Sequence, residues 1–146
     1  MSLKILLSAL VLQTHNVRIL HWNVTGLDFD PVHKTLDSYH EMLDGLADEV
    51  AEIGIQVGIA PVGLFEVFGI LKDDNRTYVS LNGSKKFTSK EAFICINDIF
   101  KNLIDLYTEV CNSDALPPDI VNKLEEHMYT LRKELQYKNV SRLYNS

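Results

Sequence analysis

The sequence lacks an excess of basic residues. Its composition therefore argues against a general nucleic-acid-binding protein. Lysine and arginine together number 14, against 20 aspartate and glutamate residues, and the formal net charge is -6 at pH 7. Phosphate attraction grows with clustered basic charge, and near its C-terminus the chain carries only Lys138 and Arg142. We therefore do not expect the protein to bind DNA directly.

Cysteine is also scarce, and the two that occur cannot bridge to each other within one chain. Cys95 and Cys111 fall in one predicted helix, which would hold them about 24 Å apart along its axis, far beyond the reach of a disulfide. A reducing, cytoplasmic location fits this composition best, although an intermolecular disulfide stays open.

A membrane-spanning apolar run is missing as well. The run ILLSALVL after Lys4 resembles the core of a short signal peptide, but it leads into Gln13-Thr14-His15-Asn16 without a small-residue cleavage site. We interpret it as the start of a core helix, and we expect no membrane association.

Apolar residues recur at helical spacing in four segments, which predicts an all-α fold. The expected helices cover residues 3–24, 31–57, 88–110 and 118–135. The connection at residues 58–87 is expected to hold a short extra helix at 62–71, and Asn82-Gly83 is typical of a hairpin turn. A long crossing connection between the second and third helices describes a ferritin-like four-helix bundle, which we expect to form a single domain over residues 1–146.

One side of the second expected helix carries only acids and imidazoles. At about 100° per residue, seven of them fall within an arc of roughly 120°: His33, Asp37, His40, Glu41, Asp44, Asp48 and Glu52. Such a stripe is usually a solvated face. Metal binding is the more specific alternative, because two histidines among five carboxylates are unusual on a surface helix.

The spacing along this helix bears on how a metal site could form. His33 and Asp37 lie one turn apart, and so do Asp48 and Glu52. The midpoints of the two pairs are about 22 Å apart on a straight helix, whereas metal–ligand distances are about 2–2.5 Å. One chain cannot close both pairs on one ion, but a second copy packed antiparallel about a two-fold axis could. Mixed histidine and carboxylate ligands with open positions favour iron over calcium or structural zinc.

A longer motif around these residues resembles the ferroxidase signature of the Dps proteins, or miniferritins. Its members in this chain are His21-Trp22-Asn23, Gly26, Phe29, His33, Asp37, Asp48, Ala51-Glu52 and Gly54. The resemblance is clearest over residues 1–64 and continues more weakly to the C-terminus.

The resemblance implies a homo-oligomeric shell of twelve subunits that oxidises Fe(II) at sites shared across a two-fold dimer interface. His21, His33 and Asp37 would come from one subunit and Asp48 and Glu52 from its partner, as the catalytic metal ligands. Hydrogen peroxide, or else dioxygen, would be the oxidant. The hollow shell would store the ferric product and so protect against oxidative damage.

Two other functions are weighed against this one. A Dps-type shell could act mainly as a DNA-coating or structural protein without ferroxidase activity, but the chain has no basic tail. An ordinary ferritin with an intrachain di-iron site would carry Glu-x-x-His pairs, and the sequence contains none.

Residues around the motif carry further expectations. We expect Phe29 to be buried in the core, and we interpret Trp22 as a packing residue, with radical quenching as the alternative. His127 is expected to be structural. Asp114 and Asp119, at the turn before the last expected helix, are either acids that line an iron-entry pore at a three-fold axis or, as the simpler interpretation, exposed loop residues.

Overall fold

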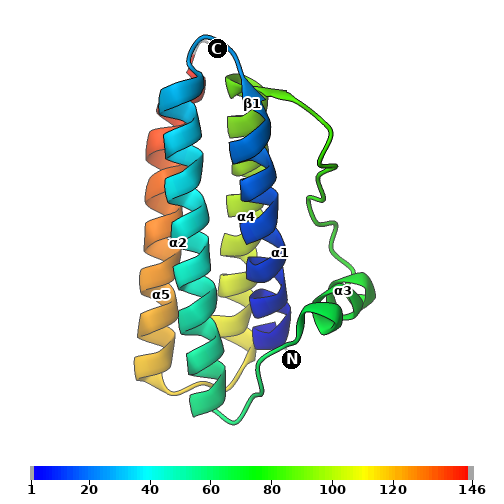
Figure 1. Cartoon of the computed structure of the whole chain (residues 1–146). Helices are drawn as coiled ribbons and strands as arrows, with labels where there is room; N and C mark the ends of the chain where they lie inside the picture. The colour runs from blue at the N-terminus through cyan, green and yellow to red at the C-terminus, as the bar shows by residue number, and fades with distance from the viewer. Residues whose placement is uncertain (1, 145–146) are drawn as a thin grey trace.

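Four long helices pack side by side and form the body of the molecule (Figure 1). The computed structural model describes residues 2–144. The bundle consists of α1 (Ser2–Asn23), α2 (Phe29–Gln56), α4 (Ser89–Ser113) and α5 (Pro118–Arg132), and α5 continues through the π-helical segment η1 (Lys133–Asn139) into α6 (Val140–Leu143). The short helix α3 (Leu64–Asp73) packs beside α1. This is the ferritin-like bundle, with an extra helix in the long connection, that the sequence predicts.

Helix α1 is a core helix. By length and composition alone it could cross a membrane, but 61% of its most apolar 18-residue window is buried inside the bundle. Its N-terminal end is fixed by Asp114, whose carboxylate Oδ2 accepts a hydrogen bond from the Leu3 backbone N–H at 3.2 Å. Asp114 therefore has a capping role, because it satisfies one of the free N–H groups at the start of α1.

The start of α4 follows the sequence, whereas the start of α2 does not. Thr88 and Glu91 form a capping box, a pattern that can be recognised in the sequence, with N–H···O distances of 3.1 and 2.9 Å. Helix α2 begins at Phe29 rather than at Pro31, because the chain turns at Gly26, where φ is +122°. The Asp28 carboxylate accepts a hydrogen bond from the Ser89 hydroxyl at 2.6 Å and makes no cap bond to α2.

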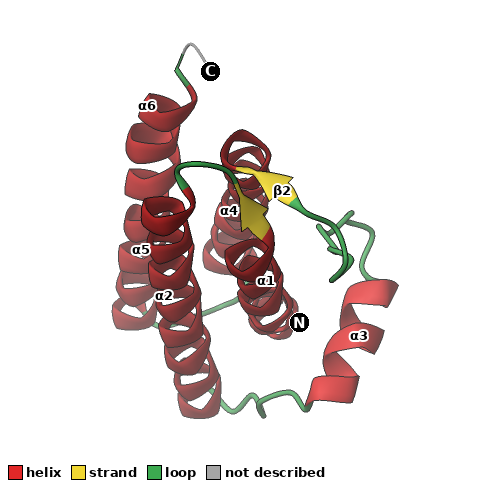
Figure 2. Ribbon diagram, turned by 45° about the horizontal axis from the view of Figure 1, so that its top comes forward, coloured by secondary structure: helices red, strands yellow, loops and turns green. Residues whose placement is uncertain are grey.

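The long connection returns along α1 (Figure 2). Side-chain amides of α1 hold it there. Asn16 Nδ2 donates to the Val79 carbonyl at 2.7 Å, and Asn23 Nδ2 donates to the carbonyls of Gly83 and Lys85 at 2.7 and 2.9 Å. Both asparagines are buried. Buried amides of this kind are stable because their polar atoms find partners.

The predicted hairpin at Asn82-Gly83 is wrong. These residues form a turn, and the described strands are two short segments far apart in the sequence, β1 (Val24–Thr25) and β2 (Phe87–Thr88), which pair in parallel. The hairpin does not form because α1 supplies the hydrogen-bond partners, through Asn23 and through β1 at its end.

We predict that Asn23→Ala lowers the free energy of unfolding by about 1–3 kcal/mol, because two carbonyls of the connection lose their donor at a buried position. Chemical denaturation at fixed protein concentration measures the change. The exposed Asn122→Ala on α5 is the matched control, with an expected change within about 0.5 kcal/mol. Equal effects of the two substitutions would contradict the anchoring role of Asn23.

Candidate metal centre

The end of α1 and the first turns of α2 place His21 and His33 face to face. The ring centroids lie 3.7 Å apart and the ring planes differ by 18°, so the imidazoles are stacked. His21 Nδ1 lies 2.8 Å from the backbone carbonyl oxygen of His33, and His33 Nδ1 lies 2.7 Å from that of His21. Two candidate ligands from different helices are thus held together by reciprocal hydrogen bonds.

These hydrogen bonds fix the tautomer of both rings. A carbonyl oxygen can only accept, so each Nδ1 must carry the hydrogen and donate it. The lone pair of each neutral ring then lies on Nε2. An imidazole whose Nδ1–H is held by a backbone carbonyl is the form that binds a metal through Nε2, with its ring already oriented.

Asp37 is the carboxylate at this end of α2. Its Oδ1 lies 3.9 Å from His21 Nε2, and its side chain is 53% exposed whereas that of His21 is 15% exposed. Within residues 2–144, no group of three or more His, Cys, Asp or Glu side chains is arranged to hold an ion. The two imidazoles and the carboxylate therefore form an open, incomplete set in one chain.

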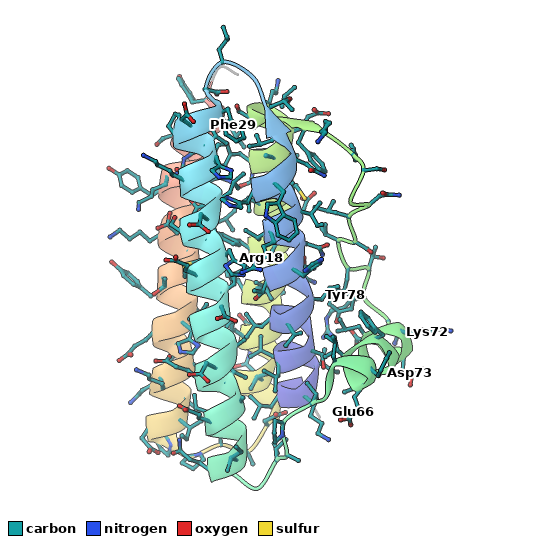
Figure 3. All side chains as sticks on the ribbon, in the orientation of Figure 1. Arg18, Phe29, Glu66, Lys72, Asp73 and Tyr78 are labelled. Carbon is teal, nitrogen blue, oxygen red and sulfur yellow. The ribbon has the colours of Figure 1, made fainter. Side chains whose placement is uncertain are left out.

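Phe29 covers the outer side of the histidine pair. Its ring stacks on that of His33, with centroids 4.7 Å apart and planes 25° apart. The expectation that Phe29 lies in the core is wrong, since this residue is 37% exposed. Because α2 begins at Phe29 itself, the ring lies at the end of the bundle, next to the α1–α2 loop, rather than inside (Figure 3).

The other two candidate ligands lie at the far end of α2. Asp48 and Glu52 are exposed, and α2 continues without interruption from Phe29 to Gln56. The separation of about 22 Å between the two ends therefore holds in the folded chain. Asp48 borders a shallow cavity of about 420 Å³ whose lining includes Leu7 of α1 and Pro61 of the connection.

The middle of the acidic face is occupied by Arg18 of α1, which lies between α1 and α2 (Figure 3). Arg18 Nε donates to His40 Nε2 at 2.8 Å, and its guanidinium lies 5.8 Å from the centre of the Trp22 ring. Burial and the charge of Arg18 lower the pKa of His40 from its usual value. His40 is therefore a neutral acceptor, with the nitrogen that would bind a metal already occupied.

Trp22 is not buried. The residue is 52% exposed, and its ring contacts Arg18 and lies T-shaped to the ring of His15, with the two centroids 6.2 Å apart. Trp22 therefore packs against other side chains, as predicted, but it does so at the surface and not in the core.

An apolar groove lies beside the acidic face, between α1, α2 and α3. It encloses about 500 Å³, and its lining combines apolar and polar side chains: Val11, Leu12, Thr14, His15, Arg18, His40, Asp44, Leu64, Val67 and Phe68. Three large apolar residues of α3 are exposed here or nearby, Leu64 at 65%, Phe65 at 92% and Phe68 at 54%. Large exposed apolar side chains gathered on one short helix are typical of a contact site for another molecule.

Comparison with known proteins places this arrangement in a family. No family model matches the chain. A protein of Helicobacter pylori named DNA protection during starvation protein is 32% identical to it over 129 residues, which are 86% of this chain and 83% of that protein. The chain belongs to the Dps family.

Solved structures agree with this membership. The crystal structure of Helicobacter cinaedi CAIP superposes on the Dps-family chain with a TM-score of 0.83 at 25% identity, covering 97% of this chain and 96% of that one. A Dps protein from Bacillus brevis has the same fold, with a TM-score of 0.77 at 18% identity, covering 92% and 88%. The predicted family and the predicted bundle are both confirmed.

Arg18 is the residue of this region that the sequence did not reveal. Arg18 lies on α1 and His40 on α2, 22 residues apart in the sequence, and only the packing of α1 on α2 brings them together. A basic residue near the HWN motif is the one signal in the sequence that could have indicated it.

We predict that Arg18→Gln raises the pKa of His40, because the guanidinium no longer opposes the positive imidazolium while Asp44 and Asp37 continue to favour it. Titration of histidine-selectively ¹³C-labelled protein by NMR measures the shift. Lys34→Gln, which removes an exposed cation of α2 elsewhere, is the control and should leave the titration of His40 in place. An unchanged His40 titration in Arg18→Gln would refute the electrostatic role of Arg18.

Proposed function

We propose that this Dps-family chain is a ferroxidase and iron-storage subunit, which oxidises Fe(II) with hydrogen peroxide and retains the ferric product in a hollow homo-oligomeric shell. The observation that carries the proposal is the reciprocally bonded pair His21 and His33, which presents two oriented Nε2 atoms at one end of α2. Asp48 and Glu52 stand exposed at the other end of the same helix.

The ligand set suits a redox-active ion. Asp37, Asp48 and Glu52 would hold Fe(II) and stabilise the higher charge of Fe(III), while the imidazoles of His21 and His33 bind either oxidation state. Because the pair is pre-oriented by backbone carbonyls, little side-chain order is lost when iron binds. Positions left open on the ion admit the oxidant.

A second copy of the chain would complete each site. If two α2 helices pack antiparallel, the histidine end of one meets Asp48 and Glu52 of the other, and a two-fold axis creates two equivalent sites. Two features near the middle of α2 support this contact. A Cβ at Gly45 would have no atom within 4 Å beyond the backbone of its own helix, and the exposed apolar residues Leu64 and Phe68 of α3 line the adjacent groove.

The shell is proposed to contain twelve subunits, as the family resemblance implies. Iron is the substrate and cargo here. The middle of the acidic face, where Glu41 and Asp44 are exposed, offers further carboxylates that could bind ferric ions as mineral begins to form.

A DNA-coating shell is the second candidate function, because the curated relatives are named for DNA protection during starvation. The net charge of -6 weighs against direct binding to a polyanion. Protection of DNA by removal of iron and peroxide requires no contact with DNA.

We predict that His33→Ala and Asp48→Ala each abolish most Fe(II) oxidation by peroxide, because each substitution removes a proposed iron ligand. The two residues lie at opposite ends of α2, and neither substitution removes much core volume, so both variants should fold. Oxidation is followed by the absorbance of the ferric product, and shell size by light scattering. Asp105→Ala, an exposed acid of α4, is the control. Full activity in both ligand variants would refute the site.

Co-expression of the two inactive variants tests whether the site is shared. A mixed pair contains one site with both halves intact and one with both halves damaged, so random pairing restores about one quarter of the sites. A site built within one chain would show no rescue. Recovery of activity in mixed shells, against none in either pure variant, is the expected result.

We also predict no retardation of duplex DNA by the assembled protein at physiological salt, because the chain has a net charge of -6. An electrophoretic mobility shift measures it. Retardation that persists at that salt concentration would favour the DNA-coating function.

A further inference from the structure

A hydrogen-bonded chain of three side chains runs from the core to the surface, away from the histidine pair. The Tyr107 hydroxyl of α4 lies 2.8 Å from His127 Nδ1 of α5, and His127 Nε2 is hydrogen-bonded to the Glu49 carboxylate of α2. Tyr107 is fully buried and His127 is 3% exposed, whereas the Glu49 side chain is 44% exposed. The ferroxidase proposed above uses none of the three.

The direction of both hydrogen bonds follows from chemistry. An ionised carboxylate can only accept, so His127 Nε2 carries a hydrogen and donates it to Glu49. Burial lowers the pKa of His127, even though Glu49 favours the imidazolium, and the ring is neutral. Its Nδ1 therefore has a free lone pair, and the Tyr107 hydroxyl donates to it.

Such an arrangement controls where a phenol proton can go. Loss of one electron makes a phenol strongly acidic, and a buried positive charge is costly unless the proton can leave. His127 accepts the proton across a 2.8 Å hydrogen bond, and Glu49 then stabilises the imidazolium that forms. The core keeps a neutral phenoxyl group.

The other tyrosines with described partners differ from Tyr107. Tyr39 donates to the carboxylate of Glu134 and also accepts from Arg142, whose charge opposes oxidation of the ring. Tyr78 donates to the carboxylate of Asp74, which is paired with Arg76. In both cases the acceptor is a carboxylate that is itself paired with a cation, Glu134 with Lys138 and Asp74 with Arg76, whereas Tyr107 donates to a neutral imidazole.

We propose that Tyr107 is a redox-active residue that gives one electron to strong oxidants such as the hydroxyl radical, while its proton moves to His127 Nδ1. The hydroxyl radical gains this electron and a proton from solvent and becomes water. The phenoxyl radical is then reduced by an electron from a further Fe(II), which becomes Fe(III), and it takes the proton back from His127. One radical and one Fe(II) are consumed, and Tyr107 is regenerated.

The position of Glu49 connects this chain to the chemistry of the shell. Glu49 immediately follows Asp48 on α2, so the chain of hydrogen bonds ends beside the second candidate half-site. For the source of the radical, the proposal rests on the proposed function, because hydrogen peroxide and Fe(II) yield hydroxyl radicals whenever one electron is transferred instead of two.

The test needs no iron. Pulse radiolysis of the assembled, metal-free protein in azide solution produces azide radicals, which oxidise exposed tryptophan and tyrosine side chains by one electron. In the unaltered protein we expect a long-lived tyrosyl radical, seen by its absorbance and by EPR after freezing, because a buried phenoxyl cannot couple with another radical. Tyr107→Phe should lose this long-lived component.

Two further variants distinguish an effect on proton transfer from an effect on folding. Tyr129→Phe, an exposed tyrosine of α5, is the matched control and should keep the long-lived radical. Glu49→Gln leaves Tyr107 in place but removes the charge that stabilises the imidazolium, so the radical should form in lower yield and decay faster. Circular dichroism and shell size verify that each variant folds.

The outcomes also distinguish this proposal from the proposed ferroxidase. A long-lived radical that survives in Tyr107→Phe, or that is unaffected by Glu49→Gln, overturns the redox role and leaves a structural hydrogen-bond chain. Loss of the radical in Tyr107→Phe supports the role even in a protein that fails to oxidise iron. Normal iron oxidation with no long-lived radical in the unaltered protein refutes the role of Tyr107 alone.

Discussion

The rest of the candidate metal centre depends on two N–H···O=C hydrogen bonds, in which the rings of His21 and His33 each donate to the backbone carbonyl of the other residue. They link the last turn of α1 to the first turns of α2, and they hold both rings in one tautomer. Because these side chains bind backbone, neither helix can slide along the other without breaking partly buried hydrogen bonds. The same bonds that position the helices thus prepare the imidazoles for a metal.

The straightness of α2 then determines what one chain can do alone. A helix rises about 1.5 Å per residue, so the residues near His33 and those near Asp48 stay far apart whatever their side chains do. In the proposed dimer this separation becomes useful, since each helix serves two sites. Glu49, beside Asp48 but turned toward α5, carries a separate set of contacts through His127 to Tyr107.

The sequence predicted the helices well, because their signals are local. The capping box of Thr88 and Glu91 and the apolar periodicity of α4 lie within one segment. It also placed the acidic face on α2 and, through the resemblance to Dps proteins, joined His21 to it. It failed for Phe29 and for the hairpin, and it did not reveal Arg18. Each of these depends on how α1 packs against another segment, which no single stretch of sequence records.

The anchoring of the long connection has a consequence for its evolution. Asn16 and Asn23 bind carbonyl oxygens of the residues they hold, and every residue type offers the same carbonyl. The hydrogen bonds from α1 therefore set the path of this part of the connection, whereas the side chains of Ser80 and Lys86 are exposed. Exposed positions of the connection such as these two are accordingly places where a lineage, or a protein engineer, can vary side chains while the bundle beneath stays the same.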